Sequence, residues 1–348
     1  MKNSSIKKYF VNKDTKISSV IKMLQDNPIK LVIVVTSKNE LVGSVTDGDI
    51  RRGLLEGYDL NDKCSCIMNT TPSYAYSDDK DMISEILSQK KVIPIIVNKN
   101  RVVISLYHST LPSSETIKTN KVVIMAGGKG ERLMPLTQDT PKPLLSIKDK
   151  PIIQYIIEDF LKHGFEDIIV SIGYKSEKLI EYFKNDNSIS KYVSFISEKR
   201  PLDTAGALSL IPNDELNEPI IVKNGDIISN INYDDLLNFH NIHGMPITIC
   251  ASEYKVSIPF GSITTKNGIV SEIVEKPTMR HYVNAGIYII NPEIIKKMKK
   301  NTPISMIELL DDYINSGNVA AYPLHESWAD IGSPEDFKRA QKKGYDYD

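Results

Sequence analysis

Apolar residues in the first third of the chain follow a pattern that occurs twice. The first copy begins with the apolar face of an amphipathic helix, formed by Ile17, Val20, Ile21 and Leu24. The second copy begins with the equivalent face, formed by Met82, Ile83, Ile86 and Leu87. An apolar run follows each helix, and a polar loop then leads into a second apolar strand. The chain from about Lys7 to His108 is therefore predicted to be a degenerate internal repeat of one helix and two strands.

A polar segment separates this repeat from the rest of the chain. Residues 109–120 are rich in Ser and Thr and lack apolar periodicity, which is typical of a linker. Beyond it, short apolar runs alternate with helical patterns, one of which begins at Pro151 and stops before Gly164. We therefore expect two domains, residues 1–115 and 120–348. The second has the alternation of an α/β fold with a mainly parallel mixed sheet, and the first is a smaller α+β domain.

Composition narrows the class of protein. The chain has 348 residues, of which 41% are hydrophobic and 25% charged, as in a globular protein. The net charge of -1 favours neither nucleic acid nor a membrane surface as a partner, so phosphate-binding groups must be local. Three cysteines are too few for a disulfide framework and are expected to be buried thiols. Without a signal peptide or an apolar run of membrane-spanning length, the protein is expected to be cytoplasmic.

A glycine-rich turn, AGGKGER, follows the first strand of the second domain. Open parallel sheets bind ligands at the carboxyl ends of their strands. Glycines at such a turn let backbone amides approach a phosphate without an intervening side chain. The turn is neither a Walker loop nor the GxGxxG dinucleotide fingerprint. Taken alone, it fits a tight turn equally well.

Charged residues after this turn strengthen the phosphate interpretation. Arg132 follows the turn directly, and Lys142 lies ten residues further on, between two prolines that stiffen the chain. A triphosphate needs several cations that converge from a rigid frame, although either residue alone would fit a solvated surface cation. The later strand IIVKNGD ends in Asp226, which suits a magnesium ion bridging phosphates. Asn-Gly at the same place also fits a hairpin turn.

The combination GGKGERLxPLTxxxPKPLL closely resembles the sugar-1-phosphate nucleotidyltransferase family, and the resemblance continues through the rest of the chain. It implies a Rossmann-like domain in which phosphates are contacted by Arg132, Lys142 and Lys276. It places the catalytic Mg²⁺ on Asp226 and Asp330. It implies a nucleotide site formed by Ala126, Gly127, Gly128, Gly130, Glu198, Thr204 and Gly206. It implies a sugar site formed by Gly261, Glu275 and Asn284.

Several of these residues also have plainer interpretations. Glu198 could accept hydrogen bonds from the N1 and N2 groups of guanine, or it could be an exposed Glu in a polar loop. Gly261 fits a bulge in a strand, and Lys276 before Pro277 fits a strand end. Asp203 stands where family members often have Gly, so the role of the turn around Thr204 is open.

The first domain resembles a tandem pair of cystathionine-beta-synthase-type (CBS) domains. The resemblance depends on GSVTDGDIRR in the first copy and on repeat length in the second. It implies that Thr46 and Asp49 hold the ribose of a regulatory nucleotide. The second copy has SLYHS at this place and lacks the acidic group. A structural pair that dimerises the protein is the alternative to a nucleotide sensor.

The union of both domains resembles the glucosamine-1-phosphate guanylyltransferases of bacterial legionaminic acid pathways. The resemblance implies that the protein converts GTP and glucosamine 1-phosphate to GDP-glucosamine and pyrophosphate. Paired modules of the CBS type often associate, so a homo-oligomer is expected. The sugar phosphate is already an anionic nucleophile, so we expect direct displacement without a covalent intermediate. Mannose- or heptose-1-phosphate guanylyltransferase and glucose-1-phosphate thymidylyltransferase are the alternatives. A catalytically inactive nucleotide-sugar sensor is the alternative of another class.

Overall fold

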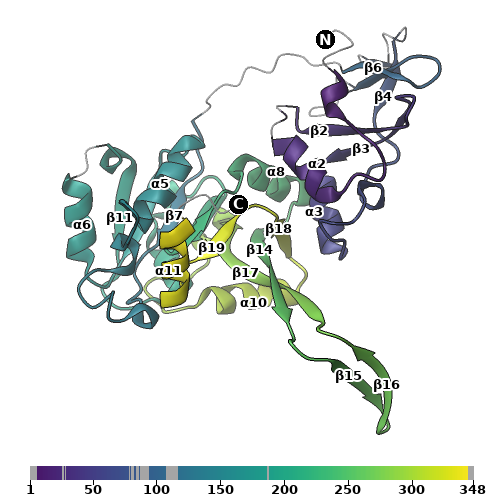
Figure 1. Ribbon diagram of the computed structural model, residues 1–348. Coiled ribbons are helices and arrows are strands. Elements are labelled where there is room, and N and C mark those ends of the chain that lie inside the picture. Colours follow the sequence, from purple (N-terminus) through teal and green to yellow (C-terminus); the bar gives the residue numbers. More distant parts are fainter. Residues whose placement is uncertain are drawn as a thin grey trace. The chain divides into compact units, whose positions relative to one another are not determined.

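The computed structural model describes residues 6–25, 27, 29–77, 79, 82–83, 86, 94–106, 117–185 and 188–343. The chain divides into two compact units, Met1–Ser114 and Glu115–Asp348 (Figure 1). The division falls within the polar segment 109–120, most of which lies outside the described residues. No helix of the described part is long and apolar enough to cross a membrane.

In the first unit, two three-stranded sheets share one strand arrangement. One sheet contains β1 (Phe10–Val11), β2 (Leu31–Val35) and β3 (Leu41–Thr46), and the other contains β4 (Tyr74–Tyr76), β5 (Ile95–Val97) and β6 (Val103–Leu106). In each sheet the first strand is parallel to the second, and the third is antiparallel to it. The two copies of the predicted repeat therefore have the same sheet topology.

Helices complete the first copy of the repeat. α2 (Ile17–Gln25) and α3 (Asp47–Leu55) bury their apolar faces in one core with β2 and β3. Short 3₁₀ turns, η1 (Lys7–Tyr9) and η2 (Cys64–Cys66), flank these elements. The helix predicted around Met82 falls largely outside the described residues. Cys64 and Cys250 are buried as expected, but the expectation is wrong for Cys66, which is exposed.

The second unit is built around a seven-stranded sheet in the order β11-β10-β7-β12-β17-β14-β18. Its strands are β7 (Val122–Met125), β10 (Ile168–Ile172), β11 (Val193–Ser197), β12 (Ile220–Asn224), β14 (Ile247–Ser257), β17 (Thr278–Ile290) and β18 (Val319–Leu324). β17 is antiparallel to both of its neighbours, and all other adjacent pairs are parallel. The predicted mainly parallel mixed sheet is confirmed.

Helices cover both faces of this sheet (Figure 1). On one face, α5 (Ile152–Lys162), α6 (Ser176–Asn185) and α8 (Tyr233–His243) pack against Val122 and Ile124. On the other face, α7 (Asp203–Gly206), α9 (Pro292–Lys296) and α10 (Met306–Asn315) pack in the core that contains Val123. Successive residues of a strand point to opposite faces, so β7 is buried on both sides. The C-terminal helix α11 (Pro334–Lys343) joins the first of these cores through Ala340.

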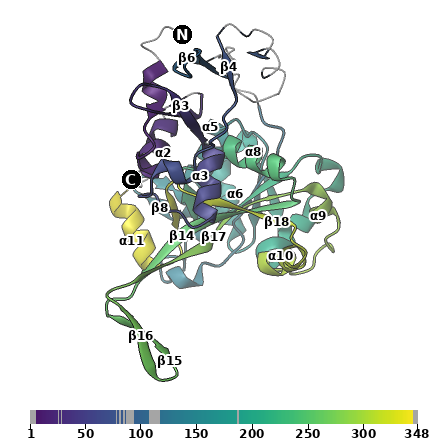
Figure 2. The same cartoon turned by 90° about the vertical axis from the view of Figure 1, so that its right-hand side faces the viewer.

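The ends of β14 and β17 leave the sheet as a two-stranded arm (Figures 1 and 2). The arm ends in a hairpin of β15 (Ser262–Lys266) and β16 (Ile269–Val274). Large apolar side chains on it are exposed, including Phe260 at 73% and Ile269 at 74%. The pattern ITICA predicted only the buried start of β14. The rest of that strand, from Ser252 to Ser257, is mostly polar and was not predicted.

Candidate active site

The carboxyl ends of three parallel strands bring several of the predicted nucleotide and metal residues to one edge of the sheet. Ala126 and Gly127 follow β7, Glu198 follows β11, and Asp226 lies just beyond β12. The backbone connects them closely, because Gly225 N–H donates to the Met125 carbonyl at 2.8 Å and Ala126 N–H to the Ser171 carbonyl at 3.0 Å. A parallel sheet with these turns forms a ligand-binding edge.

The glycine turn approaches its neighbours more closely than a side chain would allow. A Cβ at Gly127 would lie 2.5 Å from Glu198 Oε1, whereas a Cβ at Gly128 would meet open space. Gly130 has a left-handed backbone, with φ of 65°, and precedes the 3₁₀ turn η3 (Glu131–Leu133). The Thr137 hydroxyl donates to the Gly130 carbonyl at 2.9 Å. The turn is therefore fixed from two sides, which favours a preformed phosphate cradle.

Two aspartates far apart in the sequence are brought together by a small second sheet. β13 (Ile227–Ser229) pairs antiparallel with β19 (Trp328–Asp330), with Ile227 opposite Asp330. Ile331 N–H also donates to the Asp226 carbonyl at 3.0 Å. The Asn-Gly turn before Asp226 therefore does not close a hairpin, since β12 and β13 belong to different sheets.

Cations converge on this aspartate pair. Lys142 begins the 3₁₀ turn η4 (Lys142–Leu144), and its largely buried ammonium forms an ion pair with Asp226. Burial raises the pKa of Asp330 above its usual value, and the negative charge of Asp226 raises it further. Lys142 and Arg132 act in the opposite direction. Arg132 lies beside Gly332, where a Cβ would approach its Nη1 to 3.4 Å. The structure thus gathers Arg132, Lys142, Asp226 and Asp330 into one charged cluster.

The donor set of this cluster fits a magnesium ion. Asp330 Oδ1 is buried and has no hydrogen-bond partner among the described residues. A buried carboxylate oxygen without a partner is costly unless a cation or donor satisfies it. Within the described ranges, no group of three or more His, Cys, Asp or Glu side chains forms a metal cage. Magnesium suits such a site, because it commonly takes one or two carboxylates together with substrate phosphates and water.

Glu198 is held by hydrogen bonds to both of its carboxylate oxygens. The Ser171 hydroxyl donates to Oε1 at 2.8 Å, and Leu202 N–H donates to Oε2 at 3.0 Å. Sequence reasoning missed Ser171. The available signal was a hydroxyl inside the otherwise apolar strand IIVSI, which is buried along its whole length. Of the two interpretations of Glu198, the geometry favours an oriented acceptor over a freely solvated side chain.

The neighbouring turn uses its predicted residues to contact α10. Thr204 Oγ1 accepts a hydrogen bond from Met306 N–H at 2.7 Å. Gly206 is the last residue of α7 and lies between this helix and the 3₁₀ turn η6 (Ala207–Leu210). A Cβ at Gly206 would lie 2.8 Å from the Thr302 carbonyl oxygen. A close backbone approach therefore accounts for this glycine.

The predicted sugar residues form two separate groups. Gly261 and Glu275 face each other at the base of the hairpin, where a Cβ at Gly261 would lie 3.1 Å from Glu275 Oε2, and the exposed Lys276 adjoins them. Asn284 lies on β17, where it donates to the Tyr288 hydroxyl at 2.8 Å and accepts from Gly286 N–H at 3.0 Å. In the part of the chain that the structure describes, no hydrogen bond or ion pair joins these residues to the aspartate cluster.

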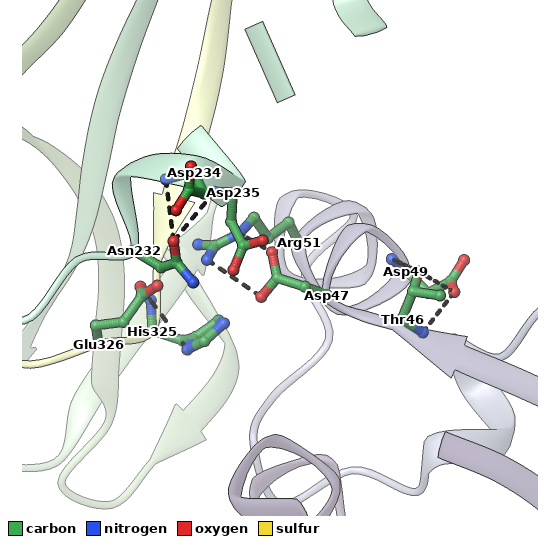
Figure 3. Close-up of polar contacts among 9 residues, drawn as sticks. All are labelled: Thr46, Asp47, Asp49, Arg51, Asn232, Asp234, Asp235, His325 and Glu326. Carbon is green, nitrogen blue, oxygen red and sulfur yellow. Dashed lines mark hydrogen bonds and ion pairs between the residues drawn. The ribbon is translucent and has the colours of Figure 1, made fainter. Parts of the chain in front are cut away.

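In the first unit, Thr46 and Asp49 bond to each other (Figure 3). They form a capping box at the start of α3, in which the Thr46 hydroxyl and Thr46 N–H donate to Asp49 Oδ2 at 2.7 and 2.8 Å. Arg52 forms an ion pair with the same carboxylate. Such a box stabilises a helix start, so these residues have a structural role in the absence of any ligand.

The profile of one family, described as nucleotidyl transferase, matches residues 121–346. The chain belongs to the nucleotidyl transferase family. The CBS domain profile matches residues 5–56 of the chain, which form the first copy of the repeat.

Curated relatives match the second unit of the chain. Mannose-1-phosphate guanyltransferase beta-A from Xenopus laevis is 32% identical over 224 residues, and the match covers 62% of each chain. Mannose-1-phosphate guanylyltransferase catalytic subunit beta from Danio rerio is 33% identical with the same coverage. The match therefore spans less than two thirds of the length of these relatives.

Solved structures match the same part. HddC from Yersinia pseudotuberculosis, also solved in complex with GMP-PN, is 30% identical and has a TM-score of 0.51. The match covers 64% of this chain and 99% of HddC. A putative glucose-1-phosphate thymidylyltransferase from Bacillus anthracis, at 22% identity and a TM-score of 0.53, shares the fold.

Proposed function

We propose that this protein transfers a guanylyl group from GTP to a sugar 1-phosphate and releases pyrophosphate. The observation that carries the proposal is the cluster of Arg132, Lys142, Asp226 and Asp330 beside the glycine turn. Cations and two carboxylates at the ligand-binding edge of a parallel sheet suit a triphosphate and its metal. The family membership of residues 121–346 supports the same reaction.

The reaction needs no nucleophilic side chain. An oxygen of the sugar phosphate attacks the α-phosphorus of the triphosphate, and the bond from this phosphorus to the α,β-bridging oxygen breaks. Pyrophosphate leaves with the bonding electrons, and no proton has to move. Arg132 and Lys142 neutralise charge on the triphosphate and the leaving group, and Lys276 holds the sugar phosphate. The Lys142–Asp226 ion pair keeps this cation at the strand end before substrate arrives.

Asp226 and Asp330 are the residues that would hold Mg²⁺. When bound, the ion supplies positive charge that stabilises the phosphate oxygens and orients them. The buried, unpartnered Asp330 Oδ1 and the raised pKa of this carboxyl both support a cation at this place.

Guanine is the base that Glu198 suits. Its two carboxylate oxygens keep free lone pairs after accepting from Ser171 and Leu202, and guanine presents the N1–H and N2–H donors side by side. Thymine and adenine do not offer this pair of donors. The names of the two curated relatives, both mannose-1-phosphate guanylyltransferases, support the same base.

The sugar has two leading candidates. Resemblance of the whole chain to glucosamine-1-phosphate guanylyltransferases favours glucosamine 1-phosphate, for legionaminic acid or related surface glycans. The curated relatives favour mannose 1-phosphate to the same extent. In either case Gly261 leaves room for the sugar. The Glu275 carboxylate accepts hydrogen bonds from the sugar hydroxyls, and the Asn284 amide can donate to them or accept from them.

A pyrophosphate-release screen tests the proposal. It crosses five nucleoside triphosphates with glucosamine, N-acetylglucosamine, glucose, mannose and heptose 1-phosphates in the presence of Mg²⁺. We expect release with GTP and one or two of the sugars. Release with only UTP or dTTP would refute the guanine assignment. No release with any pair would refute catalysis and favour a nucleotide-sugar sensor.

The other expected partners stay predictions. We infer that residues 1–115 form the regulatory module and residues 120–348 the catalytic domain. A nucleotide at Thr46 and Asp49 would have to displace part of the capping box, so calorimetric titration of the full chain and of Asp49→Ala with adenine and guanine nucleotides tests this site. Self-association is tested by light scattering after size-exclusion chromatography across a range of protein concentrations.

A further inference from the structure

A buried lysine lies three residues before Asp226, outside the charged cluster. Lys223 is the last but one residue of β12, and its side chain is 1% exposed. The three preceding residues, Ile220–Val222, are buried and apolar. An ammonium in such surroundings costs free energy unless its hydrogen bonds are satisfied, and an apolar residue would pack here without that cost.

The ammonium reaches two elements beyond the end of β12. Nζ donates to the Ser229 hydroxyl at 3.0 Å and to the Tyr233 hydroxyl at 2.9 Å. It also lies 5.5 Å from the centre of the Phe160 ring and 5.6 Å from that of Tyr233, within cation–π range. Lys223 thereby links β12 with the last residue of β13 and the first residue of α8.

These links enclose the segment that carries Asp226. β12 ends at Asn224, Asp226 lies in the turn that follows, and β13 ends at Ser229. β13 pairs only with β19 in the described sheets, through three residues on each strand. A two-stranded pairing of this length is marginal by itself. A hydrogen bond from the rigid central strand to Ser229 therefore limits how far β13, and with it Asp226, can move relative to the sheet.

We propose that Lys223 is a positioning residue that holds Asp226 opposite Asp330 by fastening β13 to the central strand β12. The proposal rests on the metal role of the two aspartates in the proposed function. Lys223 itself contacts neither carboxylate in the described hydrogen bonds and ion pairs. Its effect is to add a fixed point at the far end of β13, so that the distance between the two carboxylates is held by more than the three-residue pairing, the backbone hydrogen bonds beside it and the burial of Ile227 and Ile228.

Removal of Lys223 must not leave another buried charge behind. The side chain of Asp159 on α5 is largely buried, and its negative charge acts on Lys223. Breaking such a charge pair on one side destabilises a protein for reasons unrelated to positioning. The test variant is therefore Asp159→Asn/Lys223→Met in the full chain, and Asp159→Asn alone is its matched control, because it keeps both hydrogen bonds of the ammonium.

The first measurement is the affinity for Mn²⁺ alone, by electron paramagnetic resonance, with the thermal unfolding midpoint of each variant. We expect the double variant to bind Mn²⁺ ~10- to 100-fold more weakly than Asp159→Asn, as when a group that orients a metal ligand is lost. Its unfolding midpoint should be unchanged or higher. Equal Mn²⁺ affinity in the two variants would overturn the proposal. A weaker affinity of the double variant that is accompanied by a lower thermal unfolding midpoint would overturn it as well, because general destabilisation would then explain the loss.

The second measurement is turnover, once a substrate pair is known. The Mg²⁺ concentration for half-maximal activity should rise by the same factor, while KM for the nucleotide stays within ~2-fold, since no nucleotide contact changes. Ser229→Ala removes one hydrogen-bond partner of Lys223 and should also weaken Mn²⁺ binding. If the double variant does not fold, the Mn²⁺ affinity of Ser229→Ala is the test of the proposal. Lys184→Met, at an exposed position of α6, should change nothing. A wild-type protein that binds Mn²⁺ but releases no pyrophosphate would refute the proposed function and leave this test intact.

Discussion

Replacing Lys223 by methionine should change how the stability of the second unit depends on pH. Burial lowers the pKa of Lys223 from 10.5 to about 8, and the negative charge of Asp159 opposes part of this effect. The folded protein therefore gives up this proton at lower pH than the unfolded chain does. Between pH 8 and 10.5 the unfolded chain binds more protons, so the free energy of unfolding rises with pH. Below pH 8 both states are protonated, and the cost of the buried charge is fully present.

The magnitude follows from the two pKa values. At ~1.4 kcal/mol per pH unit, a pKa lowered from 10.5 to about 8 costs the folded state about 3 kcal/mol in neutral solution. From pH 8 to pH 10, about 2 kcal/mol of this cost should disappear. The comparison is best made between Asp159→Asn and Asp159→Asn/Lys223→Met. Both variants lack the Asp159 carboxyl, so titration of that group cannot contribute to the difference between them. Loss of the Asp159 charge lowers the pKa of Lys223 further, which leaves the expected change at about 2 kcal/mol.

Urea unfolding monitored by tryptophan fluorescence measures this difference in the second unit alone. Trp328 is the only tryptophan of the chain, and its Nε1 donates to the Ala285 carbonyl at 2.8 Å. Linear extrapolation at pH 8, 9 and 10 gives the free energy of unfolding of both variants. The lysine-containing variant should gain about 2 kcal/mol relative to the methionine variant across this range. A difference that stays constant with pH, or that changes in the opposite direction, would refute the assignment of a buried ammonium.

Three further predictions test the site. Asp226→Ala should reduce kcat by at least ~1000-fold, the several kcal/mol that a metal supplies, while circular dichroism stays native; near-normal turnover would contradict the metal assignment. Glu198→Gln should lower kcat/KM for GTP by ~10- to 100-fold and change that for UTP little, because a charged acceptor of two guanine donors is lost; equal losses for both nucleotides would argue against base recognition. Gly127→Ala places a Cβ 2.5 Å from Glu198 Oε1, so Glu198 must shift and weaken its hydrogen bonds to Ser171 and Leu202; this should lower the free energy of unfolding by ~0.5–1.5 kcal/mol, whereas Gly128→Ala, which meets open space, should change it by less than ~0.5 kcal/mol. Equal stabilities of the two alanine variants would show that the turn can relax.

The sheet of the second unit was predictable because its central strands are buried on both faces. Val122–Met125 is a continuous apolar run of strand length, and Ile168–Ile172 is apolar except for Ser171, so neither strand could be solvated on either side. The helix Ile152–Lys162 was predictable for a different reason, since its apolar residues have helical spacing and Gly164 adopts the left-handed backbone, with φ of 82°, that ends it. The apolar pattern and the helix-ending glycine within each segment are therefore enough to predict these elements.

The small sheet that joins the aspartates was not predictable from local pattern. β13 and β19 have three residues each, and about a hundred residues separate Asp226 from Asp330 in the sequence. Neither strand has enough alternation to indicate its partner, so the resemblance to a family was the only route to the pair. The arm was missed for another reason. Its apolar residues, such as Phe260 and Ile269, would be expected in a hydrophobic core, but they are exposed.

Lys223 shows why the supporting residues of a site are harder to predict than the site itself. Asp226 could be proposed as a metal ligand from the sequence because a carboxylate after a buried strand suits magnesium, although the same Asn-Gly pair also fits a hairpin turn. A lysine at the end of the apolar run Ile220–Val222 is expected to mark the point where the strand meets solvent, and only the packing of Phe160 and Tyr233 around it shows that the strand stays buried there. Its hydrogen bond to Ser229 depends on a turn whose course the sequence does not specify. The residues proposed to contact substrate follow from their chemistry, whereas those proposed to hold them in place follow from tertiary packing, which is why the structure is needed to find the second kind.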